Sequence, residues 1–258
     1  MVEDGNSKTR GGNRMEKGTL RQILLLTDGC SNEGEDPVAI AALAREQGIT
    51  VNVIGILDDS AMGEKGLKEV EEIAMSGGGV HQVVYTKQLA HTVQMVTRKG
   101  MTQTLQGVVN KELQSILGHG QEMEDLPPEK RGQVMEVVDE LGETIDLEVC
   151  ILIDTSASMQ RKLTTVEDAI LDLSISLNSR IGNNEFSLYA FPGKRKPLDE
   201  LLDWTPHLKN IHKVFPKLSS GGITPTGPAL KGALEAFNQK RSKRRLLHDE
   251  SYFEESGS

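Results

Sequence analysis

Residues 147–158 read LEVCILIDTSAS and carry the clearest indication of the fold class. Its first part is mainly apolar and ends in Asp154, which is the pattern of a strand buried on both faces of a parallel sheet. A helix is predicted to follow, because Thr164-x-x-Glu167 has the spacing of a capping box and apolar residues then recur at helical spacing. The stretch therefore predicts one strand–helix unit of an α/β domain.

Strands alternate with helices on both sides of this unit, as in a doubly wound α/β fold with right-handed crossovers. After it, two strands joined by the turn-rich segment 192–197 (PGKRKP) have the pattern of a hairpin, which places an antiparallel strand at the sheet edge. We therefore predict a Rossmann-like fold whose sheet is mostly parallel with one antiparallel edge strand. The predicted strands are 23–27, 50–57, 81–85, 147–154, 185–191 and 198–204, and the predicted helices are 37–47, 65–75, 88–98, 108–117, 134–141, 164–177, 208–218 and 228–237.

Five segments differ in composition and pattern along the chain. The polar, Gly-rich start and the charged end lack periodicity and are predicted to be flexible tails. Between two α/β segments lies a helical connecting arm, and residues 121–148 hold ten acidic side chains against two basic ones, which we interpret as a solvated acidic face. The segments are 1–18 (tail), 19–98 (α/β), 99–146 (acidic arm), 147–238 (α/β) and 239–258 (tail).

The overall composition is that of an acidic globular protein. The 258 residues hold 29 Lys and Arg against 38 Asp and Glu, a formal net charge of −9, and only 3% aromatic residues. This balance disfavours a nucleic-acid partner, because binding to phosphates needs cations and binding to single strands needs stacking surfaces. No apolar run reaches the roughly 18 residues of a membrane span, and the first residues lack the apolar centre of a signal peptide. We therefore expect a cytoplasmic protein with no membrane partner.

Oxygen-bearing side chains gather in three loops that lie next to predicted strand or helix ends. These loops are DTSAS (154–158), GGIT (221–224) and TDG (27–29). Carboxylate and hydroxyl oxygens suit a hard cation such as Mg²⁺ or Mn²⁺. In an open α/β sheet such loops meet at the carboxyl ends of the strands, where ligands bind. The six histidines lack the spacing of a zinc hydrolase, and no nucleophile elbow occurs, so no catalytic residue is predicted.

The three loops together resemble the von Willebrand factor A (VWA) domain and its metal-ion-dependent adhesion site (MIDAS). The pattern of that site is D-x-S-x-S, then a Thr after a Gly-rich loop, then an Asp that ends a later strand. The resemblance implies bound Mg²⁺ (or Mn²⁺), with one coordination position left for the carboxylate of a partner. The matching residues are Asp154, Ser156, Ser158, Thr224 and Asp28, and Thr226 is the rival to Thr224 because either hydroxyl of this proline-containing loop can face the ion.

The order of the motifs departs from the family. The D-x-S-x-S strand normally precedes the T-D-G strand, whereas here the later half of the domain occupies 19–98 and the earlier half 147–238. One explanation is a circular permutation, in which the arm joins the old chain ends, because domain termini often lie close together. The other is an exchange of halves between two chains, which gives a domain-swapped homodimer.

The resemblance implies a bacterial, non-enzymatic protein–protein interaction module that binds a Glu or Asp of a partner through the Mg²⁺-loaded adhesion site. The resemblance also allows the protein to act as a subunit together with an AAA+ ATPase, as in metal chelatases. One alternative is a Mg²⁺-dependent phosphoryl-transfer or hydrolytic enzyme on the same fold, since a fold does not determine a function. The other is a scaffold whose metal site is vestigial and whose acidic arm makes the contacts.

Overall fold

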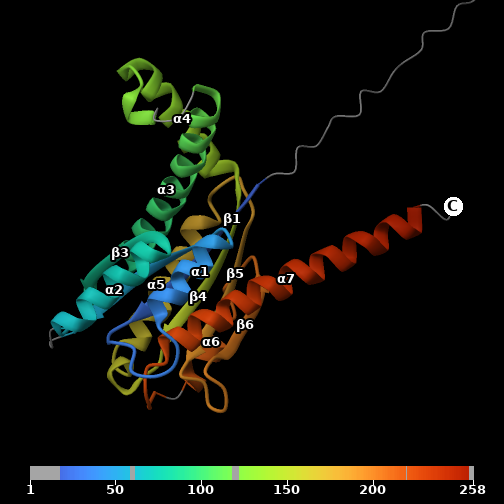
Figure 1. Ribbon diagram of the computed structural model, residues 1–258. Coiled ribbons are helices and arrows are strands. Elements are labelled where there is room, and N and C mark those ends of the chain that lie inside the picture. The colour runs from blue at the N-terminus through green and yellow to red at the C-terminus, as the bar shows by residue number, and fades with distance from the viewer. Residues whose placement is uncertain (1–17, 59–61, 118–121, 219, 256–258) are drawn as a thin grey trace, which may run out of the picture.

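One six-stranded sheet runs through the protein in the order β3–β2–β1–β4–β5–β6 (Figure 1). The structure is a computed structural model that describes residues 18–58, 62–117, 122–218 and 220–255. Neighbouring strands are parallel except for β5 and β6, which are antiparallel at one edge. The predicted doubly wound α/β fold with a mostly parallel sheet is therefore confirmed. The strands are β1 (Thr19–Thr27), β2 (Ile49–Leu57), β3 (Gly78–Tyr85), β4 (Asp146–Asp154), β5 (Asn184–Phe191) and β6 (Asp199–Thr205).

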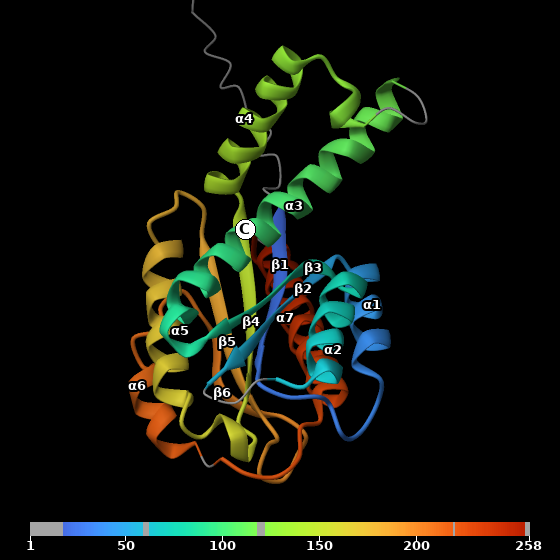
Figure 2. The ribbon, with the colours of Figure 1, turned by 90° about the vertical axis from the view of Figure 1, so that its left-hand side faces the viewer.

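Helices cover both faces of the sheet, as Figure 2 shows. One apolar core joins the sheet to α1, α2 and α7, and the other joins it to α3, α4, α5 and α6. Leu24 and Leu26 of β1 face the second core, while Ile23 and Leu25 face the first, and all four are fully buried. The continuous apolar run of this strand is thereby explained. The helices are α1 (Pro37–Glu46), α2 (Glu64–Ser76), α3 (Leu89–Leu117), α4 (Pro128–Thr144), α5 (Leu163–Leu177), α6 (Ile211–Val214) and α7 (Thr226–Glu255).

The helix α3 is one element, where the sequence predicts two separate helices at 88–98 and 108–117. It continues because its inner side stays packed beyond the predicted end: Met101 and Leu105 are buried in the core, and the Thr104 hydroxyl donates to the Gly100 carbonyl at 2.8 Å. Its final turns and α4 form the arm, which projects from the end of the sheet where the strands begin (Figures 1 and 2).

The helix α7 continues through residues 239–255, which the sequence predicts to be a flexible tail. Its basic side chains explain the difference. The Lys240 ammonium lies 3.2 Å from a carboxylate oxygen of Glu148 and 3.9 Å from the centre of the Trp204 ring, and Arg244 contacts Glu148 at 3.1 Å. The predicted N-terminal tail lies outside the described residues, apart from Gly18.

Two further helix predictions are wrong in detail. The helix α5 begins after Lys162, whose side chain makes no capping hydrogen bond, so the capping box predicted at Thr164 does not form. The predicted helix 208–218 is reduced to α6 and a short 3-10 turn, Phe215–Lys217. Within the part of the chain that the structure describes, no helix is long and apolar enough to cross a membrane.

Candidate metal centre

The carboxyl ends of β1 and β4 lie side by side, because the two strands pair in parallel within this chain. Leu26 of β1 is opposite Ile153 of β4. The residues that follow therefore meet at one edge of the sheet: Asp28 just after β1, and Asp154 at the end of β4. The topology thus brings together two carboxylates that are 126 positions apart in the sequence.

Asp154 is fully buried and anchored by neutral donors. The Ser156 backbone N–H donates to its Oδ1 at 2.8 Å, and the Thr27 hydroxyl donates to its Oδ2 at 2.7 Å. Burial raises the pKa of Asp154, the negative charge of Asp28 raises it further, and the two hydrogen bonds oppose both effects. Hydrogen bonds therefore hold the Asp154 carboxylate in place. Among the described residues, no cationic side chain contacts this carboxylate directly.

The two serines connect Asp154 to Asp28. The Ser156 and Ser158 hydroxyl oxygens lie 3.2 Å apart, and the Ser158 hydroxyl donates to Asp28 Oδ1 at 2.7 Å. Both serines follow β4 in a loop that enters the 3-10 turn Ala157–Met159, so their side chains turn toward the same point. Four of the five predicted oxygen donors are thus joined by contacts within one network.

The loop of Thr224 contacts the segment that follows Asp28 through its backbone, and no hydrogen bond joins Thr224 to the other four donors among the described residues. Asn32 Oδ1 accepts from the Thr224 N–H at 2.8 Å, and the Asn32 N–H donates to the Thr224 carbonyl at 3.2 Å. Thr224 is buried, and among the described residues its hydrogen bonds are made by main-chain atoms. The Thr226 hydroxyl is also buried and has no hydrogen-bond partner in the described part of the chain. The two threonines therefore remain rivals as the fifth donor.

Two charged residues at the site, Lys162 and Asp58, are not among the residues predicted from the sequence. Lys162 Nζ forms a hydrogen-bonded ion pair with Asp28 Oδ2, and it also lies 3.6 Å from Asp58 Oδ2. The side chains of Lys162 and Asp28 are 5% and 1% exposed, so this ion pair is buried. Asp58 follows the end of β2, and the rule that selected Asp28 after β1 could have found it.

The chemistry of these donors fits a hard divalent cation. Carboxylate and hydroxyl oxygens are the ligands that Mg²⁺ and Mn²⁺ prefer. The described residues contain no cluster of three or more His, Cys, Asp or Glu side chains that could hold a metal, so any site here depends on the hydroxyls. The residues that would hold the ion are Asp154, Ser156, Ser158 and Asp28, with Thr224 or Thr226.

Comparison with known proteins gives a family match for the first part of the chain. Residues 1–99, which include β1 and Asp28, match the family model described as the von Willebrand factor type A domain. The six-stranded sheet, the helices on both faces and the loops at its carboxyl edge agree with that match. The match covers the first 99 residues, and the sheet as a whole is consistent with a VWA-like doubly wound fold.

Two bacterial proteins are similar to most of this chain. The chain is 62% identical over 244 residues to the uncharacterized protein YabS of Bacillus subtilis (strain 168), a match that covers 94% of this chain and 100% of that protein. A crystal structure of an uncharacterized protein from Alicyclobacillus acidocaldarius subsp. acidocaldarius DSM 446 is similar at 41% identity with a TM-score of 0.80, covering 87% of this chain and 96% of that chain. The chain therefore belongs to the same family as YabS.

Proposed function

We propose that this protein binds a partner protein through a divalent cation held at the candidate metal centre, and that it does not catalyse a reaction. The observation that carries the proposal is the contact of 2.7 Å between Ser158 Oγ and Asp28 Oδ1, which joins two motifs 130 positions apart. When bound, Mg²⁺ would supply a coordination position for a carboxylate oxygen of the partner. The chain's own part is to hold Asp154 by two neutral hydrogen bonds and to aim the serine hydroxyls at the same point.

We also propose that the domain is circularly permuted. Support comes from the strand order: β1, which leads to Asp28, precedes β4, which leads to the D-x-S-x-S motif, yet the two strands pair directly in the middle of the sheet. The arm then links two halves that meet in one sheet. The same pairing can form between two copies, so a domain-swapped homodimer is the alternative, and light scattering of the purified protein distinguishes the two states by mass.

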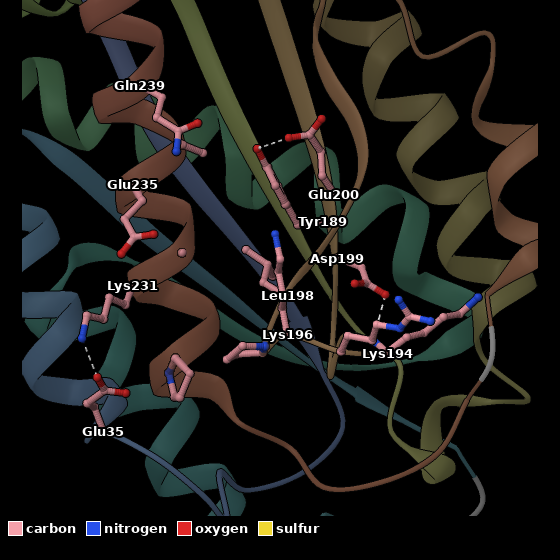
Figure 3. A pocket seen from close by; sticks show the side chains of 15 residues that line it. Glu35, Tyr189, Lys194, Lys196, Leu198, Asp199, Glu200, Lys231, Glu235 and Gln239 are labelled. Atoms are coloured by element: carbon pink, nitrogen blue, oxygen red, sulfur yellow. Dashed lines mark hydrogen bonds and ion pairs between the residues drawn. The ribbon is translucent and has the colours of Figure 1, made fainter.

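A cationic turn beside the site favours an acidic partner. The segment between β5 and β6 carries Lys194, Arg195 and Lys196, all exposed, and none of their side chains takes part in an ion pair among the described residues. This turn lines a pocket of about 960 Å³ against α7, where Lys231 is already paired with Glu35 (Figure 3). The turn begins at Pro192, directly after Phe191, whose carbonyl accepts from the Thr155 N–H next to the metal ligands. A partner segment with several acids could contact both the ion and this turn.

The test is thermal unfolding in EDTA and in excess Mg²⁺ or Mn²⁺. For ion at about a hundred times its dissociation constant, linkage predicts roughly 2.7 kcal/mol of stabilisation. Asp28→Ala and Asp154→Ala should both lose that gain, while Glu140→Ala on the exposed face of the arm should keep it. An unchanged wild-type melting temperature would contradict the metal-dependent function.

Partner binding is tested with a fluorescent oligoglutamate peptide in Mg²⁺ and in EDTA. Binding should require the ion, and replacing Lys194, Arg195 and Lys196 with Glu should weaken it without reducing the metal-induced stabilisation. An AAA+ ATPase is the partner class to test next, because the family resemblance allows it. Turnover of a generic phosphoester that disappears in Asp154→Ala would instead support the enzyme alternative.

A further inference from the structure

Lys162 occupies a position where its charge is locally unfavourable. It occupies the N-cap position of α5 without making a capping hydrogen bond, and a cation there opposes the helix dipole. Its side chain is also 5% exposed, and burying an ammonium is costly unless it is well paired. Two unfavourable features at one residue require a compensating partner, and Asp28 supplies it.

The partner that compensates Lys162 is also a donor of the proposed metal centre. Asp28 uses Oδ1 to accept from Ser158 and Oδ2 to accept from Lys162, so both carboxylate oxygens have a partner. A divalent cation that uses Asp28 as a ligand would therefore meet a positive charge within contact distance of the same carboxylate. Two like charges about 4 Å apart repel strongly at the effective dielectric constant of a protein, by several times the thermal energy.

Lys162 has a second carboxylate within reach. Asp58 Oδ2 lies 3.6 Å from Lys162 Nζ, and its side chain is 36% exposed, against 1% for Asp28. Lys162 lies between two pockets: one of about 440 Å³, lined also by Asp28, Asp58 and Ser158, and one of about 510 Å³, lined also by Asp58 and Arg161. Lys162 therefore has a second carboxylate within reach and borders open space beside Asp58.

We propose that the Lys162 ammonium is a built-in competitor of the divalent cation at Asp28, and that its transfer to Asp58 opens the centre to the ion. The inference rests on the proposed function, because it concerns the same centre. In the metal-free state Lys162 neutralises the buried carboxylate of Asp28 and stabilises the fold. In the loaded state the ion takes over that neutralisation, and Asp58 retains the ammonium. The affinity for the ion is then set by the difference between these two ion pairs.

The experiment compares Mg²⁺ and Mn²⁺ affinity of the full chain by calorimetry, together with the melting temperature in EDTA. Lys162→Met should unfold at a lower temperature in EDTA yet bind the ion at least about tenfold more tightly, because a competing charge is gone. Lys162→Arg keeps the charge and should not gain affinity. Arg161→Met removes the neighbouring exposed cation and serves as the control for a general change in charge.

Asp58→Asn tests the transfer itself. It should weaken binding of the ion in the wild-type background, because the ammonium loses its second partner, and it should have little effect in the Lys162→Met background. An equal loss in both backgrounds means that Asp58 acts directly on the ion, which overturns the transfer. Unchanged or weaker binding by Lys162→Met overturns the competition while leaving the metal centre in place. If neither the wild type nor Lys162→Met binds either ion, the proposed function itself fails.

Discussion

Glu148 is predicted to be the residue that holds the second half of α7 against the sheet. It lies on β4 with its side chain 4% exposed, and three cations surround its carboxylate: Arg21 at 3.1 Å, Lys240 at 3.2 Å and Arg244 at 3.1 Å. The perturbation is Glu148→Gln, which keeps the shape of the side chain and removes its charge. Three cations would then share fewer carboxylates at the junction of β1, β4 and α7.

The expected loss of stability is worked from the exposure of the partners. Removing one member of a fully buried ion pair costs about 3–5 kcal/mol. The cost here is lower, because the Arg244 side chain is 58% exposed and Lys240 keeps a second carboxylate, that of Glu185. We expect about 2–3 kcal/mol, less than for a fully buried pair because exposed members contribute little. For a domain of this size the melting temperature should fall by roughly 4–12 °C.

The assay is urea unfolding followed by far-ultraviolet circular dichroism, with thermal melts as a second measurement. Glu185→Gln is the matched control, because it shares Lys240 and Arg244 but its side chain is 35% exposed. That variant should lose less than about 1 kcal/mol. Equal losses in the two variants would show that the burial of Glu148 does not set its contribution to stability.

Three further predictions concern other parts of the fold. Burial raises the pKa of Cys150 to about 12, so this thiol stays protonated in the folded state at a pH where the thiol of the unfolded chain ionises. The free energy of unfolding should therefore fall as the pH rises above about 8.5, by up to about 1.4 kcal/mol per pH unit. Cys150→Ala should flatten that pH dependence in urea titrations at pH 8–10. A Cβ at Gly227 would lie 1.8 Å from the Glu35 carbonyl oxygen, so Gly227→Ala should lower the melting temperature, whereas Gly107→Ala on α3, where a Cβ meets nothing within 4 Å, should raise stability by up to about 1 kcal/mol. The Arg180 guanidinium donates to two main-chain carbonyls at the end of α4, at 2.7 and 2.8 Å, and Arg180→Met should speed amide exchange in α4 more than in the sheet; equal acceleration everywhere would contradict this.

The strands and the sheet class could be predicted from the sequence because buried parallel strands are continuous apolar runs. The strand predicted at 50–57 is observed as Ile49–Leu57, and the one predicted at 147–154 as Asp146–Asp154. Helix ends are set less by local pattern. Past the predicted end of the last helix, Lys240 of α7 pairs with Glu148 and Glu185, which lie 50 or more positions away in the sequence, so a local pattern alone predicts a charged tail there.

At the candidate site, the motifs that identify the oxygen donors give no indication of Lys162, the cation that pairs with Asp28. D-x-S-x-S is a local motif, and Asp28 is found by the rule that parallel strands end at one edge. Lys162 belongs to no motif, and its pairing with Asp28 spans 134 positions. The spacing Thr164-x-x-Glu167 predicts that the helix starts at Thr164, whereas α5 starts directly after Lys162, a buried lysine that local preference disfavours at a helix N-terminus. Places where local rules fail in this way are often functional, and this one coincides with the candidate metal centre.

The binding hypothesis places the partner contact at the candidate metal centre, and the scaffold hypothesis places it at the arm. Because the centre and the arm lie at different ends of the sheet, the two hypotheses can be tested separately. The centre lies at the carboxyl ends of the strands, whereas the arm leaves the sheet where the strands begin (Figure 2). The helix α3 has 29 residues and starts at the carboxyl edge, so it spans about 43 Å at a rise of about 1.5 Å per residue. A short acidic peptide cannot contact both ends at once. A partner whose binding is lost both in Asp154→Ala and on removal of the arm must therefore extend along the molecule, while a partner sensitive to one change alone identifies which end it uses.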